Sequence, residues 1–339
     1  MNNNILKYFI FFTLFLSLIF IIGIQTSLAS SLPFELRGRF LIQVDNKGQA
    51  WYVDTNNNLR HDISNNNSFL ELAKNVGLGI SNSDLQKIPI AINNNLITID
   101  SDKDGLDDEL EKAIGTNPFN SDSDGDGYSD KTEILHHFNP SGKGKLLIDT
   151  KLASNLAGKL LLQVEGQGQV WYVNPGDNLR YYIKNHNDLL KIISLTGQGI
   201  NSDNLKLIID NKEIKAGAEK NIKIDVSKKQ RLYYYLGDTE IGSFPISSGK
   251  YSTPTPKGSF KIINKHPKAW SYFGLWMPYW MGLGTGSFGL HELPIWPSGY
   301  REGESHLGVP VSHGCIRLGV GSAKFLYNWA EVGTPVYIY

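Results

Sequence analysis

The chain of 339 residues contains a single cysteine, Cys315, which lies in the segment VSHGCIRL. A thiol becomes an effective nucleophile only as a thiolate, and a nearby imidazole can take its proton. Two histidines are candidates for that base: His313, two residues away, and His291 in the segment GLHELP. Gly314 lets the backbone approach a substrate closely, and its N–H could bind an oxyanion together with that of Cys315. These residue types therefore predict nucleophilic catalysis by cysteine.

Taken singly, each of these residues is also consistent with an inert structural role, because lone buried cysteines and hydrogen-bonded histidines are common in protein interiors. Their arrangement decides between the two interpretations. The segments TPTPKGSF, GLHE and SHGCIRL, in this order, resemble the L,D-transpeptidase catalytic domain of the YkuD family. A papain-like endopeptidase fits less well, since those enzymes place the cysteine before the histidine in the chain.

The resemblance covers about the last third of the chain, residues 221–339, and implies a role for each matching residue. Cys315 is the nucleophile, and His291 is the general base, oriented by the backbone carbonyl of Glu292. The other residues implied for catalysis are Ser312 and His313, which shape the site, and Gly314, which supplies an oxyanion N–H with Cys315. The residues expected to bind substrate are Arg317, Glu292, Tyr279 and Trp280, where Arg317 either binds a carboxylate or braces the loop.

The resemblance also implies the substrate, a peptidoglycan tetrapeptide stem that is attacked at the amide before its terminal D-Ala. D-Ala leaves, a thioester forms, and the amine of a neighbouring stem resolves it into a cross-link. Carbapenem β-lactams are expected to acylate the same cysteine. Two alternatives stay open: water resolves the thioester, which makes the protein an L,D-carboxypeptidase, or the chain is a non-catalytic, calcium-stabilised wall-binding protein.

The spacer between His291 and Ser312 is longer than is usual in the family, so the segment WPSGYREGESHLG is expected to carry an inserted loop that affects substrate preference. The aromatic stretch WSYFGLWMPYWMGLG (residues 270–284) suits either a lid over the acyl-donor peptide or core packing.

Two acidic segments, residues 100–111 and 122–133, both fit the pattern D-x-D-x-D-G-x-x-D-x-x-E. Oxygen ligands at this spacing suit calcium, the glycine permits a sharp turn, and so many carboxylates would repel one another without a cation. The pattern resembles thrombospondin type 3 calcium repeats more than an EF-hand pair, because no entering helix precedes it. A solvated acidic linker is the alternative. The predicted ligands are Asp100, Asp102, Asp104, Leu106, Asp108 and Glu111 in the first loop and Asp122, Asp124, Asp126, Tyr128, Asp130 and Glu133 in the second, with Leu106 and Tyr128 acting through their carbonyls.

An internal repeat flanks these loops. The segment GRFLIQVDNKGQAWYV, which begins at residue 38, is echoed by GKLLLQVEGQGQVWYV, which begins at residue 158. Each copy predicts a β-hairpin followed by a helix, at residues 69–76 and 189–195. The aromatic residues Trp51, Tyr52, Trp171 and Tyr172 are either stacking platforms for sugars of a wall polymer or the core of a small module. Core packing is favoured, since so short a module needs its aromatic residues buried.

The first 29 residues predict export. Lys7 precedes an apolar run over residues 8–24, and small residues follow at a position that suits signal peptidase. The run is long enough that an uncleaved membrane anchor is the alternative to a cleaved signal peptide. Either way, we expect the rest of the chain outside the cytoplasm, in the periplasm or the cell wall. Lys plus Arg and Asp plus Glu are 33 each, so no net basic field attracts nucleic acid.

The sequence therefore predicts a multidomain protein. Two small α+β repeat modules, residues 38–90 and 158–210, flank a calcium-loop segment at 98–142. A linker at 211–220 leads to a mainly-β catalytic domain at 221–339, whose helical signal is confined to about 320–331.

Overall fold

The structure is a computed structural model that describes residues 32–339 and divides into two compact units. The barrel unit comprises Leu207–Tyr339, Asn56–Leu59 and the described residues up to Glu35, and the repeat unit comprises Leu36–Thr55 and Arg60–Lys206. The predicted export segment, residues 1–29, lies outside the described residues. Across residues 32–339, no helix has both the length and the apolar character needed to cross a membrane.

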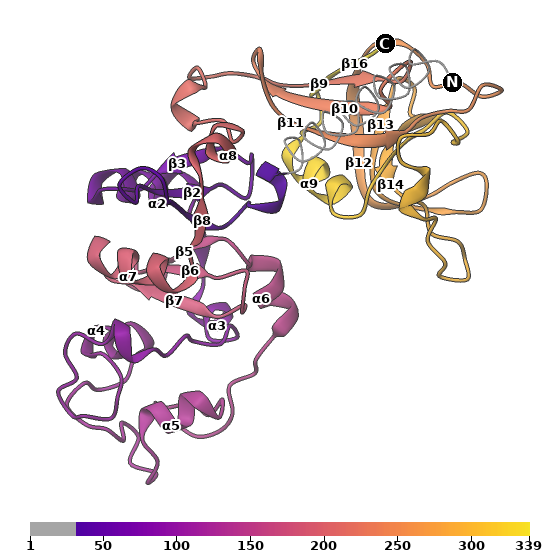
Figure 1. The fold of residues 1–339 in the computed structure, drawn as a ribbon. Coiled ribbons are helices and arrows are strands. Elements are labelled where there is room, and N and C mark those ends of the chain that lie inside the picture. The colour runs from indigo at the N-terminus through magenta and orange to yellow at the C-terminus, as the bar shows by residue number, and fades with distance from the viewer. Residues whose placement is uncertain (1–31) are drawn as a thin grey trace, which may run out of the picture. The chain divides into compact units, whose positions relative to one another are not determined.

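Eight strands of the described barrel unit close into a β-barrel in the order β10-β11-β15-β14-β13-β12-β16-β9 (Figure 1). The strands are β9 (Lys220–Asp225), β10 (Arg231–Leu236), β11 (Thr239–Ser247), β12 (Gly258–Trp270), β13 (Trp276–Leu283), β14 (Phe288–Glu292), β15 (Ile316–Leu318) and β16 (Pro335–Ile338). Closure of the barrel leaves no strand edge unpaired. Alternate residues of each strand point inward, and Leu232 and Tyr234 of β10 are examples that are buried in the barrel core. The prediction of a mainly-β catalytic domain is confirmed.

One α-helix of the barrel unit, α9 (Ser322–Trp329), packs against β13 and β14. It buries Phe325, Leu326 and Trp329 against the barrel core, which explains the apolar periodicity that predicted a helix here. A short 3-10 helix, η3 (Glu304–His306), lies in the connection between β14 and β15. Another, η2 (Asn211–Glu213), lies in the predicted linker.

The register of β14 and β15 determines where the candidate catalytic residues lie. The two strands are parallel neighbours, with Leu290 opposite Ile316 and His291 opposite Arg317. Cys315 directly precedes β15, so the same register places it opposite Gly289, two residues before His291 on β14. The two sequence motifs are brought together by backbone hydrogen bonding rather than by their nearness in the chain.

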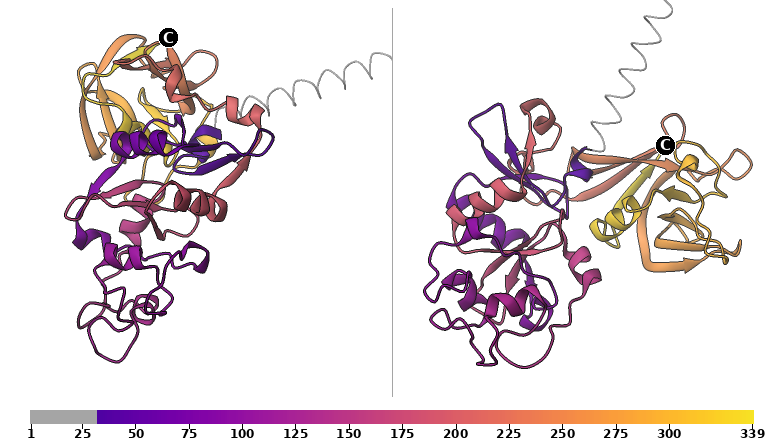
Figure 2. Two further views of the ribbon diagram at one scale, coloured as in Figure 1. Left: turned by 90° about the vertical axis from the view of Figure 1, so that its left-hand side faces the viewer. Right: turned by 60° about the horizontal axis from the view of Figure 1, so that its bottom comes forward.

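The repeat unit contains two four-stranded sheets, with the orders β3-β2-β1-β8 and β4-β5-β6-β7. The strands are β1 (Phe40–Gln43), β2 (Ala50–Val53), β3 (Arg60–Asp62), β4 (Leu78–Ile80), β5 (Leu160–Gln163), β6 (Val170–Val173), β7 (Arg180–Ile183) and β8 (Gln198–Ile200). The helices of the two copies are α2 (Asn66–Val76), α3 (Asn82–Leu85), α7 (His186–Thr196) and α8 (Ser202–Lys206). The connecting segment holds η1 (Asn94–Leu96), α4 (Asp108–Ile114), α5 (Asp130–Leu135) and α6 (Thr150–Leu156), and Figure 2 shows mostly irregular backbone around α4 and α5.

The two repeat copies exchange strands, which the sequence did not predict. Strand β8 of the second copy pairs in parallel with β1 of the first, and β4 of the first copy pairs in parallel with β5 of the second. Residues 38–90 and 158–210 therefore do not form two separate modules. Each copy alone is too small to bury an adequate core, and the exchange gives both sheets a fourth strand.

The copies also share one core. The rings of Phe40 and Tyr172, one from each copy, lie 4.3 Å apart. The Tyr52 hydroxyl donates to the Gly158 carbonyl, the Tyr172 hydroxyl donates to the Gly38 carbonyl, and both hydrogen bonds are 2.8 Å long. Trp51 and Trp171 are buried as well, so the core role predicted for the four aromatic side chains is confirmed.

We predict that Gly38→Ala destabilises the repeat unit. Gly38 has φ +72°, and a Cβ there would lie 2.5 Å from the Cα of Gly158. Gly48→Ala is the matched control, because Gly48 has φ +68° with nothing within 4 Å of the added carbon. The backbone conformation alone should cost about 1–3 kcal/mol in either variant, and the collision should add to it only for Gly38→Ala. Urea unfolding of the full chain measures both, and equal losses would contradict the close packing of the two glycines.

Candidate active site

The candidate active site is a pocket of about 420 Å³ in the barrel unit. Of the residues predicted for the site, the pocket is lined by Trp280, His291, Ser312, His313, Cys315 and Arg317. Tyr279, Glu292 and Gly314 are not among the lining residues. The lining also includes Asn264, His266, Trp270, Tyr272 and Phe273, which the sequence analysis did not single out as individual residues.

His291, near the end of β14, is fully positioned by its backbone neighbour. Its Nδ1–H donates to the backbone carbonyl of Glu292 at 2.6 Å, as the resemblance implied. Because a carbonyl can only accept, the ring proton must lie on Nδ1, and Nε2 keeps its lone pair. Burial lowers the pKa of His291 to about 4; the hydrogen bond to Glu292 opposes this shift, and the charge of Arg317 adds to it. The ring is therefore neutral near pH 7 and able to accept a proton.

Cys315 is also neutral at rest. Burial raises the pKa of the Cys315 thiol above its ordinary value, whereas a hydrogen bond from the Gly289 backbone and the charge of Arg317 lower it. The burial effect is the largest of these. The site therefore holds a neutral thiol and a neutral imidazole, so the thiol proton must be removed as the nucleophile attacks.

Ser312 and Thr255 hold the turn that presents the thiol. The Ser312 hydroxyl donates to the Cys315 carbonyl at 2.5 Å and accepts from the Gly314 N–H at 3.1 Å. The Thr255 hydroxyl, from the TPTPKGSF segment, donates to the Gly314 carbonyl at 2.9 Å. Gly314 has φ +113°, a conformation that favours glycine.

The Gly314 N–H was expected to bind an oxyanion, and here the structure differs. That N–H points at the Ser312 hydroxyl, because the turn is closed by its own side chain. Of the two predicted donors, the Cys315 N–H is the one that remains for an oxyanion.

Arg317 braces the β14–β15 connection rather than offering a free guanidinium. It is buried and forms an ion pair with Glu302, whose carboxylate also accepts from His306 at 3.1 Å. Glu302 lies in the segment that was expected to be an inserted loop. Of the two roles left open for Arg317, the structure supports bracing the loop.

Glu292 and Tyr279 were expected to bind substrate, and the structure places both elsewhere. The Glu292 carboxylate is buried, forms an ion pair with Arg301 and accepts from the Gly321 N–H at 3.3 Å. Tyr279 packs against Tyr327 of α9, with ring centroids 5.7 Å apart. Tyr279 has φ +54°, which departs from extended strand geometry, and its ring packs on α9 and is absent from the pocket lining.

Trp280 does lie at the site. Its indole N–H donates to Asn264 at 3.0 Å, and its ring stacks near His291 with centroids 6.1 Å apart and planes 25° apart. The Trp280 ring therefore forms an apolar wall beside the imidazole.

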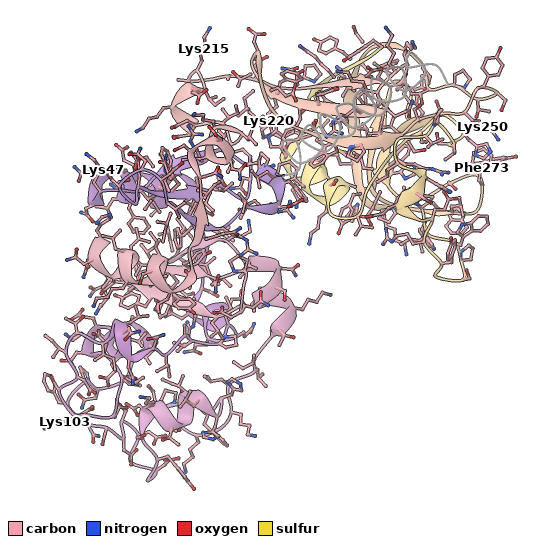
Figure 3. The ribbon with its side chains drawn as sticks, viewed as in Figure 1. Lys47, Lys103, Lys215, Lys220, Lys250 and Phe273 are labelled. Carbon is pink, nitrogen blue, oxygen red and sulfur yellow. The ribbon has the colours of Figure 1, made fainter. Side chains whose placement is uncertain are left out.

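The aromatic stretch at residues 270–284 was expected to form either a lid over the peptide or part of the core, and its two halves differ in this respect. Strand β13 is a wall of the barrel, with Met281 and Leu283 fully buried in the core. The preceding turn is exposed, and Tyr272 is 100% accessible to solvent. Phe273 stacks on His313 with ring centroids 4.4 Å apart, and Lys250 donates to the Nε2 of His313 at 3.3 Å. Figure 3 labels Phe273 and Lys250 on the barrel unit. Only the turn is thus available to cover a bound peptide.

The acidic loops gather carboxylate oxygens as the sequence predicted. Ligand atoms of Asp100, Asp102 and Asp104 lie within 4.8 Å of one another, and so do those of the matching trio Asp122, Asp124 and Asp126. Among the described residues, the buried oxygens Asp102 Oδ2, Glu111 Oε2 and Glu133 Oε2 have no hydrogen-bond partner. Such orphaned carboxylate oxygens fit a hard cation such as Ca²⁺.

The electrostatics of the two loops suit a bound cation. Burial, followed by the neighbouring aspartates, raises the pKa of Glu111 to about 8 and that of Glu133 to about 7. The carboxylates of Asp108 and Asp130 accept from the backbone N–H and the hydroxyl of serines at the second position of each loop, at 2.6 to 2.9 Å. These hydrogen bonds close the two loops, and each carboxylate oxygen keeps a second lone pair, so both aspartates stay predicted ligands.

The first loop is anchored to the second repeat copy. Asp107, which caps α4, pairs with the half-buried Lys184 at 2.8 Å. Leu110, Ala113 and Ile114 of α4 pack into the cluster that contains Trp171. The loop segment is therefore part of the repeat unit's packing rather than a free acidic linker.

We predict that Glu302→Gln lowers the melting temperature of the barrel unit, because it leaves the buried Arg317 without its counterion. Breaking a buried ion pair in this way costs about 3–5 kcal/mol. Glu331→Gln is the control, since its pair with Lys220 is largely exposed and should contribute about 1 kcal/mol or less. Calorimetry of the full chain compares the two, and an equal shift would contradict the bracing role of Arg317.

Comparison with known proteins agrees with this geometry. Residues 219–338 match the family model YkuD, described as L,D-transpeptidase catalytic domain, and residues 100–121 and 122–140 match bacterial TSP3 repeats. YkuD of Bacillus licheniformis, provisionally named as an L,D-transpeptidase, is 33% identical over 32% of this chain and 58% of its own length. YciB of Bacillus subtilis, named in the same way, is 32% identical over 35% of this chain and 66% of its own length.

Among solved structures, an L,D-transpeptidase from Mycobacterium smegmatis is 24% identical, with a TM-score of 0.32, over 36% of this chain and 59% of that one. This chain thus spans less than two thirds of each of these three proteins. The resemblance seen in the motifs is nonetheless confirmed for both segments: residues 219–338 match L,D-transpeptidase catalytic domains of the YkuD family, and residues 100–140 match bacterial TSP3 repeats.

Proposed function

We propose that the barrel unit is an L,D-transpeptidase that joins peptidoglycan stem peptides through a thioester on Cys315. The observation that carries the proposal is the hydrogen bond from His291 Nδ1–H to the Glu292 carbonyl. It leaves Nε2 as a base in the pocket that holds the chain's one thiol.

In the acylation step, His291 Nε2 takes the thiol proton as the Cys315 sulfur attacks the carbonyl carbon before the terminal D-Ala. The Cys315 N–H faces the negative charge that develops on the carbonyl oxygen. The C–N bond then breaks, and the imidazolium returns its proton to the leaving amine, so that free D-Ala departs and a thioester remains. The Glu292 carbonyl stabilises the transient imidazolium, because it accepts from Nδ1–H throughout.

In the second step, the amine of another stem attacks the thioester carbon. His291 takes the proton that this amine loses and passes it to the departing sulfur, which restores the neutral thiol. The pocket volume of about 420 Å³ lies within the range of ordinary ligand sites. Trp270, Phe273 and Trp280 give it apolar walls that suit an extended peptide.

The acidic loops are proposed to bind Ca²⁺ as a structural ion. The supporting observations are the two aspartate trios and the orphaned oxygens of Glu111 and Glu133. A bound cation would neutralise these groups and rigidify the loops against α4 and the second repeat copy. The N-terminal apolar segment supports export of the protein to the periplasm or cell wall, where both stems and calcium are available.

We predict that Cys315→Ala abolishes acylation, since the chain has no second cysteine. His291→Ala should keep the thiol and lose about 10²- to 10⁴-fold in rate, the usual contribution of a general base. His313→Ala is the comparison within the same pocket and should lose less, because that ring only stacks on Phe273 and accepts from Lys250.

Intact-mass detection of the adduct, formed with a tetrapeptide stem or a carbapenem, measures these rates. An adduct on the Cys315→Ala protein would overturn the proposal, as would equal rates for the wild type and His291→Ala. Muropeptide analysis of the products then separates cross-links from tripeptides, which would show that water resolves the thioester.

Calcium removal gives an independent prediction. Chelation should increase proteolysis between residues 98 and 142 and loosen the packing of α4, because the carboxylates then repel one another. The barrel unit should stay resistant, since its described residues contain no comparable acidic cluster. Limited proteolysis with and without chelator tests this, and identical fragment patterns would count against metal binding.

A further inference from the structure

Arg180, the first residue of β7, is a buried cation without a counterion. Its side chain is only 3% exposed. Within the described part of the chain, its Nε has no hydrogen-bond partner, and no carboxylate forms an ion pair with it. The guanidinium carbon lies 4.7 Å from the centroid of the Trp171 ring, which is a weaker partner than a carboxylate.

The equivalent residue of the first repeat copy is Arg60, and its surroundings differ. Arg60 also lies over a tryptophan, 5.0 Å from the centroid of the Trp51 ring. Its guanidinium, however, donates to the backbone carbonyl of Leu205. The repeat therefore offers an internal comparison, in which one arginine has an acceptor from the protein and the other has none.

Arg180 lines a cavity of about 220 Å³ in the repeat unit. The described residues around this cavity include Lys112 and the amide side chains of Asn82, Gln163 and Gln169, but no aspartate or glutamate. Gln163 is held in place, since it accepts from the Trp171 indole N–H at 3.1 Å and donates to Asn82 at 2.7 Å. The cavity is thus positively charged, and its polar groups are pre-arranged.

We propose that this cavity is a binding site for an oxyanion group, a carboxylate or a phosphate, that pairs with Arg180. A planar guanidinium suits such groups, because its N–H donors match two oxygens at once. The volume lies below the roughly 300–1,000 Å³ of drug-sized sites, so it suits one anionic group with at most one sugar ring. Burial lowers the pKa of Arg180 to about 9, which still leaves the side chain charged at neutral pH.

The site is independent of the proposed catalysis, because it lies in the repeat unit and needs neither Cys315 nor the barrel pocket. A carboxylate or a phosphate on a cell-wall polymer would supply the same chemistry. Binding there would give the repeat unit a role in recognition, separate from the core role of its aromatic residues.

Isothermal titration calorimetry of the full chain tests the proposal with three probes. N-acetylmuramic acid carries a carboxylate on one sugar ring, N-acetylglucosamine is the matched sugar without it, and inorganic phosphate is the alternative anion. We expect the muramic acid or the phosphate to bind, and the one that binds identifies the source of the oxyanion. Binding of N-acetylglucosamine as strong as that of the muramic acid, or no binding of either anion, would overturn the proposal.

The variants locate the binding. Arg180→Gln should weaken anion binding by about tenfold or more, the loss of affinity that follows from removing one charge-assisted hydrogen bond. Arg60→Gln should leave anion binding unchanged, because Arg60 donates to the Leu205 carbonyl. Equal affinity in wild type and Arg180→Gln would overturn the proposal. If circular dichroism shows that Arg180→Gln does not fold, Lys112→Glu replaces it, because Lys112 lines the cavity, is more than half exposed and forms an exposed ion pair with Glu109. Unchanged anion affinity in Lys112→Glu would then contradict the proposal.

Discussion

One hydrogen bond, from His291 Nδ1–H to the carbonyl of Glu292, determines what the site can do. It fixes the ring proton on one nitrogen and leaves the other as a base. The hydrogen bond joins His291 to the residue that follows it at the end of β14. The parallel pairing of β14 with β15 places Cys315, one residue before β15, in the same pocket as His291. Other contacts of the barrel unit stabilise the pairing of β14 with β15. Helix α9 packs on β13 and β14, and the Arg317–Glu302 ion pair holds the connection between β14 and β15.

The repeat unit follows a different constraint, the scarcity of buried area in a short module. The two copies bury more area together, because they exchange β4 and β8. Tyr52 and Tyr172 also each donate a hydrogen bond to the glycine carbonyl of the other copy, Gly158 and Gly38. The acidic loops are inserted between the exchanged strand β4 and the second copy, so their helix α4 packs on the core that Trp171 completes. An ion that rigidifies the loops would therefore also stabilise the packing of α4 against the core of the repeat unit.

The sequence predicted what depends on residue type and local spacing. The roles of Cys315, His291 and the orienting carbonyl follow from the resemblance that the motifs carry. The hairpins and the C-terminal helix follow from periodicity, and the buried tryptophans follow from the buried area that a short module needs. It did not predict the exchange of β4 and β8, since three-residue strands carry no periodic signal and their partners lie in the other copy. The Ser312–Gly314 hydrogen bond and the Glu302–Arg317 pair depend on distances set by the folded chain. The lack of a counterion for Arg180 among residues 32–339 likewise cannot be read from the sequence, because Arg60 occupies the same position of the repeat and has an acceptor.

The central claim is that the resting site holds a neutral thiol and a neutral imidazole, and the pH dependence of Cys315 alkylation tests it most directly. A small neutral reagent such as iodoacetamide reports the thiolate, and the chain has one cysteine. The raised pKa of Cys315 predicts slow alkylation from pH 5 to 8 and a rise only as the pH passes the ordinary thiol range. A rate that is already high and constant from about pH 5 would reveal a thiolate–imidazolium pair and would contradict the account.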